Sequence, residues 1–190
     1  MASKINRKNS VFKLLLMLAV FAACNSKIDN TDNTMNINEQ NKTPEQPKLT
    51  NDSTPKVTGI GGIFFFSDDP EKTKAWYAEN LGLETNEWGS SFEFRNAHRP
   101  NEINYLQWSP FSNGSEYFAP SKKEFMVNYR VQNIEGLVEQ LKANKVKILD
   151  EIESFEYGKF VHIMDADGNK IELWEPVDSV FTAMGGKTTK

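Results

Sequence analysis

The chain has 190 residues, enough for one ordinary domain with an accessory segment or for two very small domains. Its 22 basic and 26 acidic side chains give a formal charge of −4, which argues against a sequence-independent nucleic-acid binder, since such a protein needs a basic face. The single cysteine excludes an intramolecular disulfide and a cysteine-rich metal site.

The N-terminal residues 1–23 have the pattern of a signal peptide. Four basic side chains and no acid precede an apolar run from Leu14 to Ala23, which is too short to cross a bilayer core of about 20 residues. The stretch Phe21–Cys24 resembles the lipobox of bacterial lipoproteins, with Phe21 in place of the usual Leu. The resemblance implies that Cys24 is acylated and anchors the protein in the bacterial cell envelope. Because Asn25 rather than Asp follows, it favours the outer membrane. The alternative is an ordinary secretory signal with a chance cysteine.

Composition divides the rest of the chain into three parts. Residues 24–56 are rich in Asn and lack aromatic side chains, so they are predicted to form a disordered tether. Residues 57–177 hold all four Trp and are long enough for one core, so they form the predicted domain. Residues 178–190 are predicted to be a polar C-terminal tail.

The first half of the domain is predicted to fold as a βαβββ unit. Gly59–Phe66 has the composition of a buried strand. A helix follows, with Asp69 as its N-cap, Pro70 at its first position and Gly82 at its end. Three short strands are then expected near 83–88, 91–95 and 103–108.

The second half repeats this order. Phe125–Val131 alternates as a strand, Asn133 can cap a helix, and strands are expected at 146–150, 159–164 and 170–174. Asp165–Asn169 is a hairpin signal between the last two. The halves are offset by 65 to 66 residues, and the larger value matches Trp108 with Trp174. This spacing predicts gene duplication and pseudo-twofold symmetry.

Three segments, Gly59–Pro70, Trp76–Leu83 and Asp165–Pro176, resemble the glyoxalase/bleomycin-resistance/dioxygenase superfamily, also called vicinal oxygen chelate proteins. The resemblance covers 57–177. It implies an α+β fold in which two fused βαβββ modules form a cup-shaped mixed sheet, with helices outside and a small-molecule site within.

Strand alternation assigns side chains to the cup. Phe64 and Phe66 are expected to face the helix, and Glu172 the cup. His162 is expected opposite Glu172 across the last hairpin, where the two could act as an acid–base pair. The carboxylates near Asp150 are interpreted as a solvated edge. The candidate ligand-binding residues are Phe65, Trp108, Asn128, Arg130, Phe160 and Trp174.

Metal-using members of the family carry ligands at four cup positions, which fall here on Gly61, Leu106, Met126 and Glu172. Of these, Glu172 alone suits a hard or borderline divalent ion. We therefore expect no metal and no other cofactor.

Two functions follow as hypotheses. The first is a metal-independent, lipid-anchored protein that holds an organic ligand in an aromatic cup; Arg130 would suit an anionic group on that ligand. The second is a glyoxalase-like lyase or isomerase that uses His162 and Glu172. A pure protein-interaction module, whose cup is filled by its own side chains, is a third reading. The expected partners are a small molecule and, through the anchor, the membrane, without nucleic acid; a homodimer is compatible with exposed sheet edges.

Overall fold

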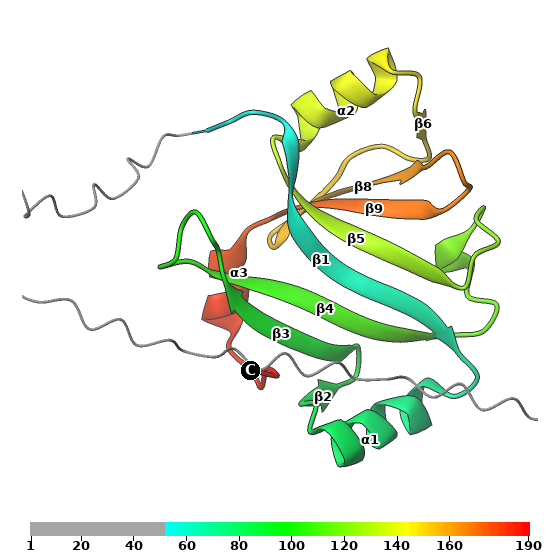
Figure 1. The fold of residues 1–190 in the computed structure, drawn as a ribbon, viewed down its shortest axis with the longest axis vertical. Helices are drawn as coiled ribbons and strands as arrows, with labels where there is room; N and C mark the ends of the chain where they lie inside the picture. The colour runs from blue at the N-terminus through cyan, green and yellow to red at the C-terminus, as the bar shows by residue number, and fades with distance from the viewer. Residues whose placement is uncertain (1–51) are drawn as a thin grey trace, which may run out of the picture. The chain divides into compact units, whose positions relative to one another are not determined.

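A computed structural model describes residues 52–190, so the predicted signal peptide, Cys24 and most of the predicted tether lie outside the described residues. Figure 1 shows the fold. Its elements in chain order are β1 (Lys56–Ser67), α1 (Pro70–Leu81), β2 (Thr85–Asn86), β3 (Gly89–Arg95), β4 (Ile103–Ser112), the 3-10 turn η1 (Glu116–Phe118), β5 (Phe125–Gln132), α2 (Ile134–Ala143), β6 (Lys147–Ile148), β7 (Glu153–Phe155), β8 (Gly158–Met164), β9 (Lys170–Pro176) and α3 (Asp178–Met184).

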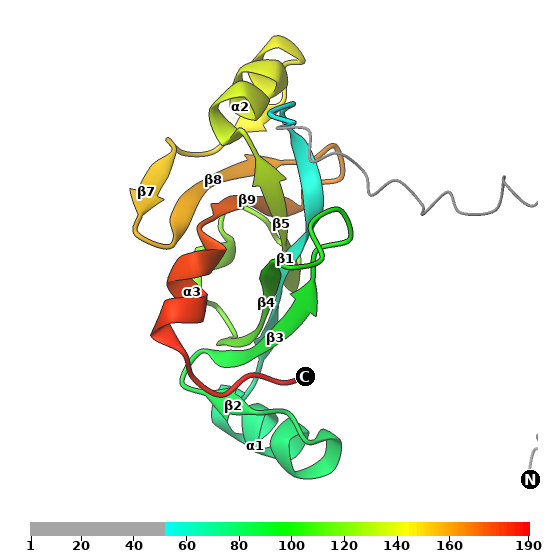
Figure 2. The same cartoon turned by 90° about the vertical axis from the view of Figure 1, so that its left-hand side faces the viewer.

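The strands form one mixed sheet in the order β2-β3-β4-β1-β5-β9-β8-β6, with β7 paired to β8. The two βαβββ units meet where β1 pairs antiparallel with β5, and each of these strands pairs in parallel with the last strand of its own unit, β4 or β9. The sheet curves without closing (Figure 2). The predicted α+β fold of two fused modules is thus confirmed.

Both predicted helices begin and end where their capping residues place them. The Asp69 side chain accepts a hydrogen bond from Lys72 N before Pro70 opens α1, and Gly82 ends the helix at φ 71°, in the left-handed region that glycine tolerates. The Asn133 side chain accepts from Gly136 N at the start of α2. Local sequence is therefore sufficient to set these boundaries.

The outer face of the second unit carries the larger hydrophobic core. The apolar face of α2, including Ile134 and Val138, packs against alternate residues of β5, β8 and β9. On the concave face, Phe64 and Met126 pack beneath Phe118 of η1. The core thus sits on both sides of the sheet, and the concave face is partly filled.

Residues 178–190 do not form the separate polar tail that their composition suggests. Asp178–Met184 forms α3, which lies on the concave side of the sheet rather than outside it (Figure 2). The terminal segment then runs along β3, where Thr189 N donates to Ser91 O and Glu93 N donates to Thr189 O. Backbone hydrogen bonds, the ring of Phe181 and the ion pair between Asp178 and Arg130 hold this segment in spite of its polarity. No helix within residues 52–190 combines the length and apolarity that crossing a membrane requires.

Candidate functional site

The centre of the concave face is a row of residues from the four central strands. Gly62 of β1 is in register with Gln107 of β4 and with Asn128 of β5, and Asn128 is in register with Glu172 of β9. Gly61 lies beside the row, where a Cβ atom would come 2.1 Å from Asn128 Oδ1. The glycines leave room for the larger polar side chains of the neighbouring strands.

Glu172 is the hub of a buried hydrogen-bond cluster. Its Oε1 accepts from Asn128 Nδ2 at 2.5 Å, and its Oε2 faces His162 Nε2 at 3.0 Å and accepts from the hydroxyl of Tyr117. His162 Nδ1 lies 2.6 Å from Asp150 Oδ2, so Asp150, which is solvent-exposed as expected, also belongs to the cluster. The expected pairing of His162 with Glu172 is present in the sheet register. The result is a hydrogen-bonded path from a surface carboxylate to a buried one.

Burial and the carboxylates shift the protonation of this cluster. Burial of His162 disfavours its charged form, but the hydrogen bond and charge of Glu172, helped by Asp150, outweigh burial and raise the pKa of His162. Burial, together with Glu172, raises the pKa of Tyr117 far above its ordinary value. The phenol therefore remains a hydrogen-bond donor to Glu172, and His162 keeps its proton to a higher pH than a free histidine does.

Aromatic side chains form one wall of the cup. Trp174 stacks on Phe160, with centroids 5.8 Å apart and ring planes at 7°, and meets Phe181 of α3 edge-on at 5.5 Å. A cavity of about 170 Å³ lies between this wall and the row, lined in part by Gln107 and Tyr157. Aromatic walls with a few convergent polar groups are typical of ligand pockets.

Arg130 is placed on the concave face, as expected, but it is already paired. Its guanidinium lies 5.2 Å from the Trp174 ring, Nη2 donates to Asp178 Oδ2 at 2.5 Å, and Nη1 donates to Tyr105 O at 3.1 Å. Asp178 belongs to α3, a segment that the sequence interpretation left outside the domain. Arg130, which the sequence analysis assigned to an anionic ligand, thus binds the C-terminal helix instead.

Two of the six candidate ligand-binding residues lie on the wrong face. Phe65 and Trp108 pack against each other, and Trp108 packs on Tyr77 of α1, outside the cup. Phe64, expected to face the helix, instead lines the cavity.

Two features of the strand register explain why Phe65 and Trp108 lie outside the cup and Phe64 inside it. Bulges in β1 between Val57 and Gly59 and between Ile60 and Gly62 insert extra residues, so the alternation expected from Gly61 reverses at Ile63. The pairing also makes Gln107, not Leu106, the counterpart of Glu172, so Trp108 falls on the outer face. A slip of one residue exchanges the faces of a strand.

Other cup residues had weaker sequence signals. Gln107 could have been found from an offset of 65 residues to Glu172. Tyr117 lies in an irregular segment without periodicity, and Asp178 and Phe181 lie beyond the repeat, so neither strand alternation nor the repeat predicts their place in the cup.

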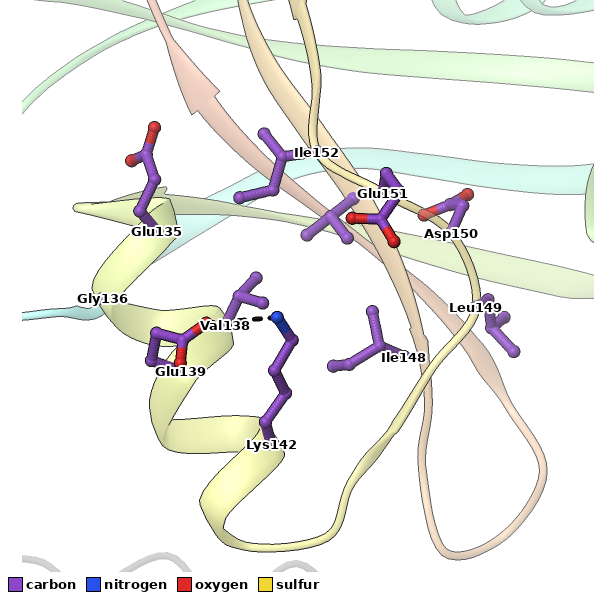
Figure 3. A pocket seen from close by; sticks show the side chains of 11 residues that line it. Glu135, Gly136, Val138, Glu139, Lys142, Ile148, Leu149, Asp150, Glu151 and Ile152 are labelled. Atoms are coloured by element: carbon purple, nitrogen blue, oxygen red, sulfur yellow. Dashed lines mark hydrogen bonds and ion pairs between the residues drawn. The ribbon is translucent and has the colours of Figure 1, made fainter.

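A second cavity, of about 520 Å³, lies outside the cup between α2 and residues 148–152 (Figure 3). Val138, Ile148 and Ile152 supply its apolar lining. At the edge of this cavity, Lys142 Nζ donates a hydrogen bond to Glu139 Oε1 at 3.1 Å. Asp150 also borders this cavity, so the path through His162 joins it to the cup.

The metal ion that the resemblance implies does not fit these residues. Gly61 offers no side chain, and both Glu172 oxygens accept hydrogen bonds from neighbouring side chains. Gln107 Oε1 accepts from Ser91 Oγ at 2.7 Å, and Met126 is packed beneath Phe118. Within residues 52–190, no three His, Cys, Asp or Glu side chains converge as a metal site requires.

The comparisons with known proteins identify one family. Residues 59–173 match the model of the Glyoxalase/Bleomycin resistance protein/Dioxygenase superfamily. No curated protein matches the chain.

Solved structures show likeness of fold alone. Methylmalonyl-CoA epimerase from Mycobacterium tuberculosis is 18% identical with a TM-score of 0.47, over 72% of this chain and 98% of that one. A superfamily member from Vibrio splendidus 12B01 is 15% identical (TM-score 0.38, 64% and 99% of the chains). The Mn(II)-bound glyoxalase from Novosphingobium aromaticivorans is 17% identical (TM-score 0.43, 64% and 40%).

Proposed function

Since the chain belongs to the glyoxalase/bleomycin resistance protein/dioxygenase superfamily, we propose that it holds a small organic molecule in its cup without a metal ion. One observation carries the proposal. Glu172, the carboxylate at the centre of the cup, is held by Tyr117, Asn128 and His162, while an aromatic-lined cavity lies beside it. A carboxylate bound in this way is a fixed acceptor for a ligand's polar group rather than a free metal ligand.

In this proposal, aromatic and polar side chains of the cup bind different parts of the ligand. Phe160 and Trp174 hold the apolar part of the ligand, and Gln107 and Asn128 orient its polar groups. An anionic ligand also needs Arg130, whose planar guanidinium suits a carboxylate. Phe65 and Trp108 take no part, because they lie on the outer face.

A thermal-shift screen with organic acids and neutral aromatics, with and without a chelator, tests the proposal. We expect a ligand whose stabilisation survives the chelator and weakens in Gln107→Ala. Ile63→Ala is the matched control, because Ile63 lies on the neighbouring strand but is 42% exposed on the outer face. Stabilisation that disappears with the chelator, or that Ile63→Ala weakens equally, would contradict the proposal.

The hydrogen-bonded path favours a second candidate function, a glyoxalase-like lyase or isomerase. His162, held between Asp150 and Glu172, can exchange protons at the edge of the cup. The test is turnover of adducts between α-keto aldehydes and thiols. Activity that is present in the protein and lost in both His162→Ala and Glu172→Ala supports this function, and activity that persists in the double variant removes the mechanism.

The location in the cell envelope is a separate proposal. It depends on the lipobox-like Phe21–Cys24, which lies outside the described residues. Fractionation of cells that express the full chain and Cys24→Ser tests it. We expect the full chain in the membrane fraction with a lipid-modified N-terminal cysteine, and Cys24→Ser released from it.

A further inference from the structure

The C-terminal helix α3 is an addition to the superfamily domain that enters the cup. The family match ends at residue 173, and α3 follows at Asp178–Met184 on the concave side (Figure 2). Two of its side chains, Asp178 and Phe181, contact residues that the proposed function assigns to the ligand. They are one helical turn apart, so they lie on the same face of the helix.

Asp178 forms an ion pair with Arg130, the cation of the cup. Arg130, whose side chain is 4% exposed, donates from Nη2 to Asp178 Oδ2 at 2.5 Å, and Asn104 Nδ2 donates to the same oxygen at 3.0 Å. The other oxygen, Oδ1, is buried and has no hydrogen-bond partner among the described residues. The carboxylate therefore uses only one of its two oxygens, although arginine can bind both in parallel.

Phe181 occupies the aromatic part of the cup. Its ring lies 5.5 Å from Trp174, 5.4 Å from Tyr105 and 5.9 Å from Tyr157, centroid to centroid, and it lines the 170 Å³ cavity. Such aromatic groupings stabilise any flat ring that enters them. A cavity of this size is smaller than typical ligand pockets, and the ring of Phe181 is part of what bounds it.

The seven residues of α3 themselves make few contacts with the cup, although the segment after them is held to β3 through Thr189. The helix has seven residues and none of them is buried; Met184 is 62% exposed. Beyond Asp178 and Phe181, one side-chain hydrogen bond, between Thr182 Oγ1 and the hydroxyl of Tyr105 at 3.1 Å, joins the helix to the sheet. Short elements with little buried apolar surface open at low free-energy cost.

We propose that Asp178 and Phe181 take the places of the carboxylate and the aromatic ring of the cup's ligand, and that the ligand displaces α3. The ligand class is then an arylalkyl carboxylate, with two or three carbons between ring and carboxylate to match one helical turn. A free carboxylate can bind Arg130 through both oxygens, which Asp178 does not do. This inference rests on the proposed function, because it needs the cup to be a ligand site.

Calorimetric titration of the full chain with 3-phenylpropionate tests the inference. We expect Asp178→Asn to bind this probe at least tenfold more tightly than the unmodified chain, because the substitution releases Arg130. The neutral amide, 3-phenylpropanamide, should show no such gain. Met184→Ala is the matched control on the exposed side of α3 and should bind as the unmodified chain does.

Hydrogen exchange on the unmodified chain gives a measurement that needs no variant. Saturating 3-phenylpropionate should speed exchange of the Gly185 amide, which donates to Phe181 O at the end of α3. Slowed or unchanged exchange with the probe bound would overturn the displacement of α3.

The titration also separates the two proposals. Equal binding to the unmodified chain and to Asp178→Asn overturns the mimicry and leaves the cup as a ligand site. Binding to neither overturns the arylalkyl carboxylate as ligand, and the thermal-shift screen then decides the proposed function independently.

Discussion

Gly61 leaves space for three side chains of the cup, and Gly61→Ala is the substitution that tests this. The strand backbone brings the Cα of Gly61 against three larger side chains. A methyl group there would lie 2.1 Å from Asn128 Oδ1, 2.8 Å from Trp174 Cε3 and 3.0 Å from Arg130 Cγ. Each is closer than ordinary van der Waals contact, so the side chains of the cup would have to move.

Gly59 in the same strand is the matched control. A methyl group at Gly59 meets only Arg130 Cδ, at 3.8 Å, which is ordinary contact. Both substitutions restrict the unfolded chain and gain about 0.4–1 kcal/mol from that effect. The difference in unfolding free energy between the two variants therefore isolates overpacking, which costs about 1–3 kcal/mol.

Urea unfolding followed by circular dichroism measures this difference. For a slope of about 2 kcal/mol per molar, typical of small proteins, the unfolding midpoint of Gly61→Ala should lie about 1 M below that of Gly59→Ala. Equal midpoints would refute the close packing of Gly61 against Asn128 and Trp174. A changed slope would instead indicate an altered unfolded or native ensemble.

Three further predictions concern the cluster and a helix cap. The pKa of His162 is raised in the folded protein, so the stability that protonated His162 contributes is full below about pH 6.5 and is lost as pH rises through that raised pKa. The difference in unfolding free energy between the unmodified chain and His162→Gln should therefore shrink from about pH 5.5 to about pH 9, and a constant difference would contradict this. Glu172→Gln should cost about 2–4 kcal/mol in urea unfolding, because Tyr117 and Asn128 lose a charged acceptor, and a loss below 1 kcal/mol would show that the cluster is not tightly coupled. Asn133→Ala should cost about 1–2 kcal/mol but Asn133→Gly only a few tenths, since φ is 53°; thermal unfolding of the two variants checks the order.

The sequence by itself determined the two helices of the repeat and every strand except β7, but not η1 or α3. Asp69, Pro70, Gly82 and Asn133 cap the helices because capping needs only neighbouring backbone. The alternation of β5 and β9 assigned Asn128, Arg130, Glu172 and Trp174 to the concave face, since these strands have a regular register with each other. The hairpin likewise placed His162 opposite Glu172.

Only the tertiary structure decided which residues of the first unit enter the cup and what covers it. The two bulges of β1 and the one-residue difference in offset moved Phe65 and Trp108 outside and brought Phe64 and Gln107 inside. Pattern reasoning assumes an unbroken period of two, and a single inserted residue reverses every later assignment. The pairing of Arg130 with Asp178 joins residues 48 positions apart, and no local pattern encodes it. Long-range contacts of this kind arise from the curvature of the sheet, which brings the C-terminal helix into its concave face.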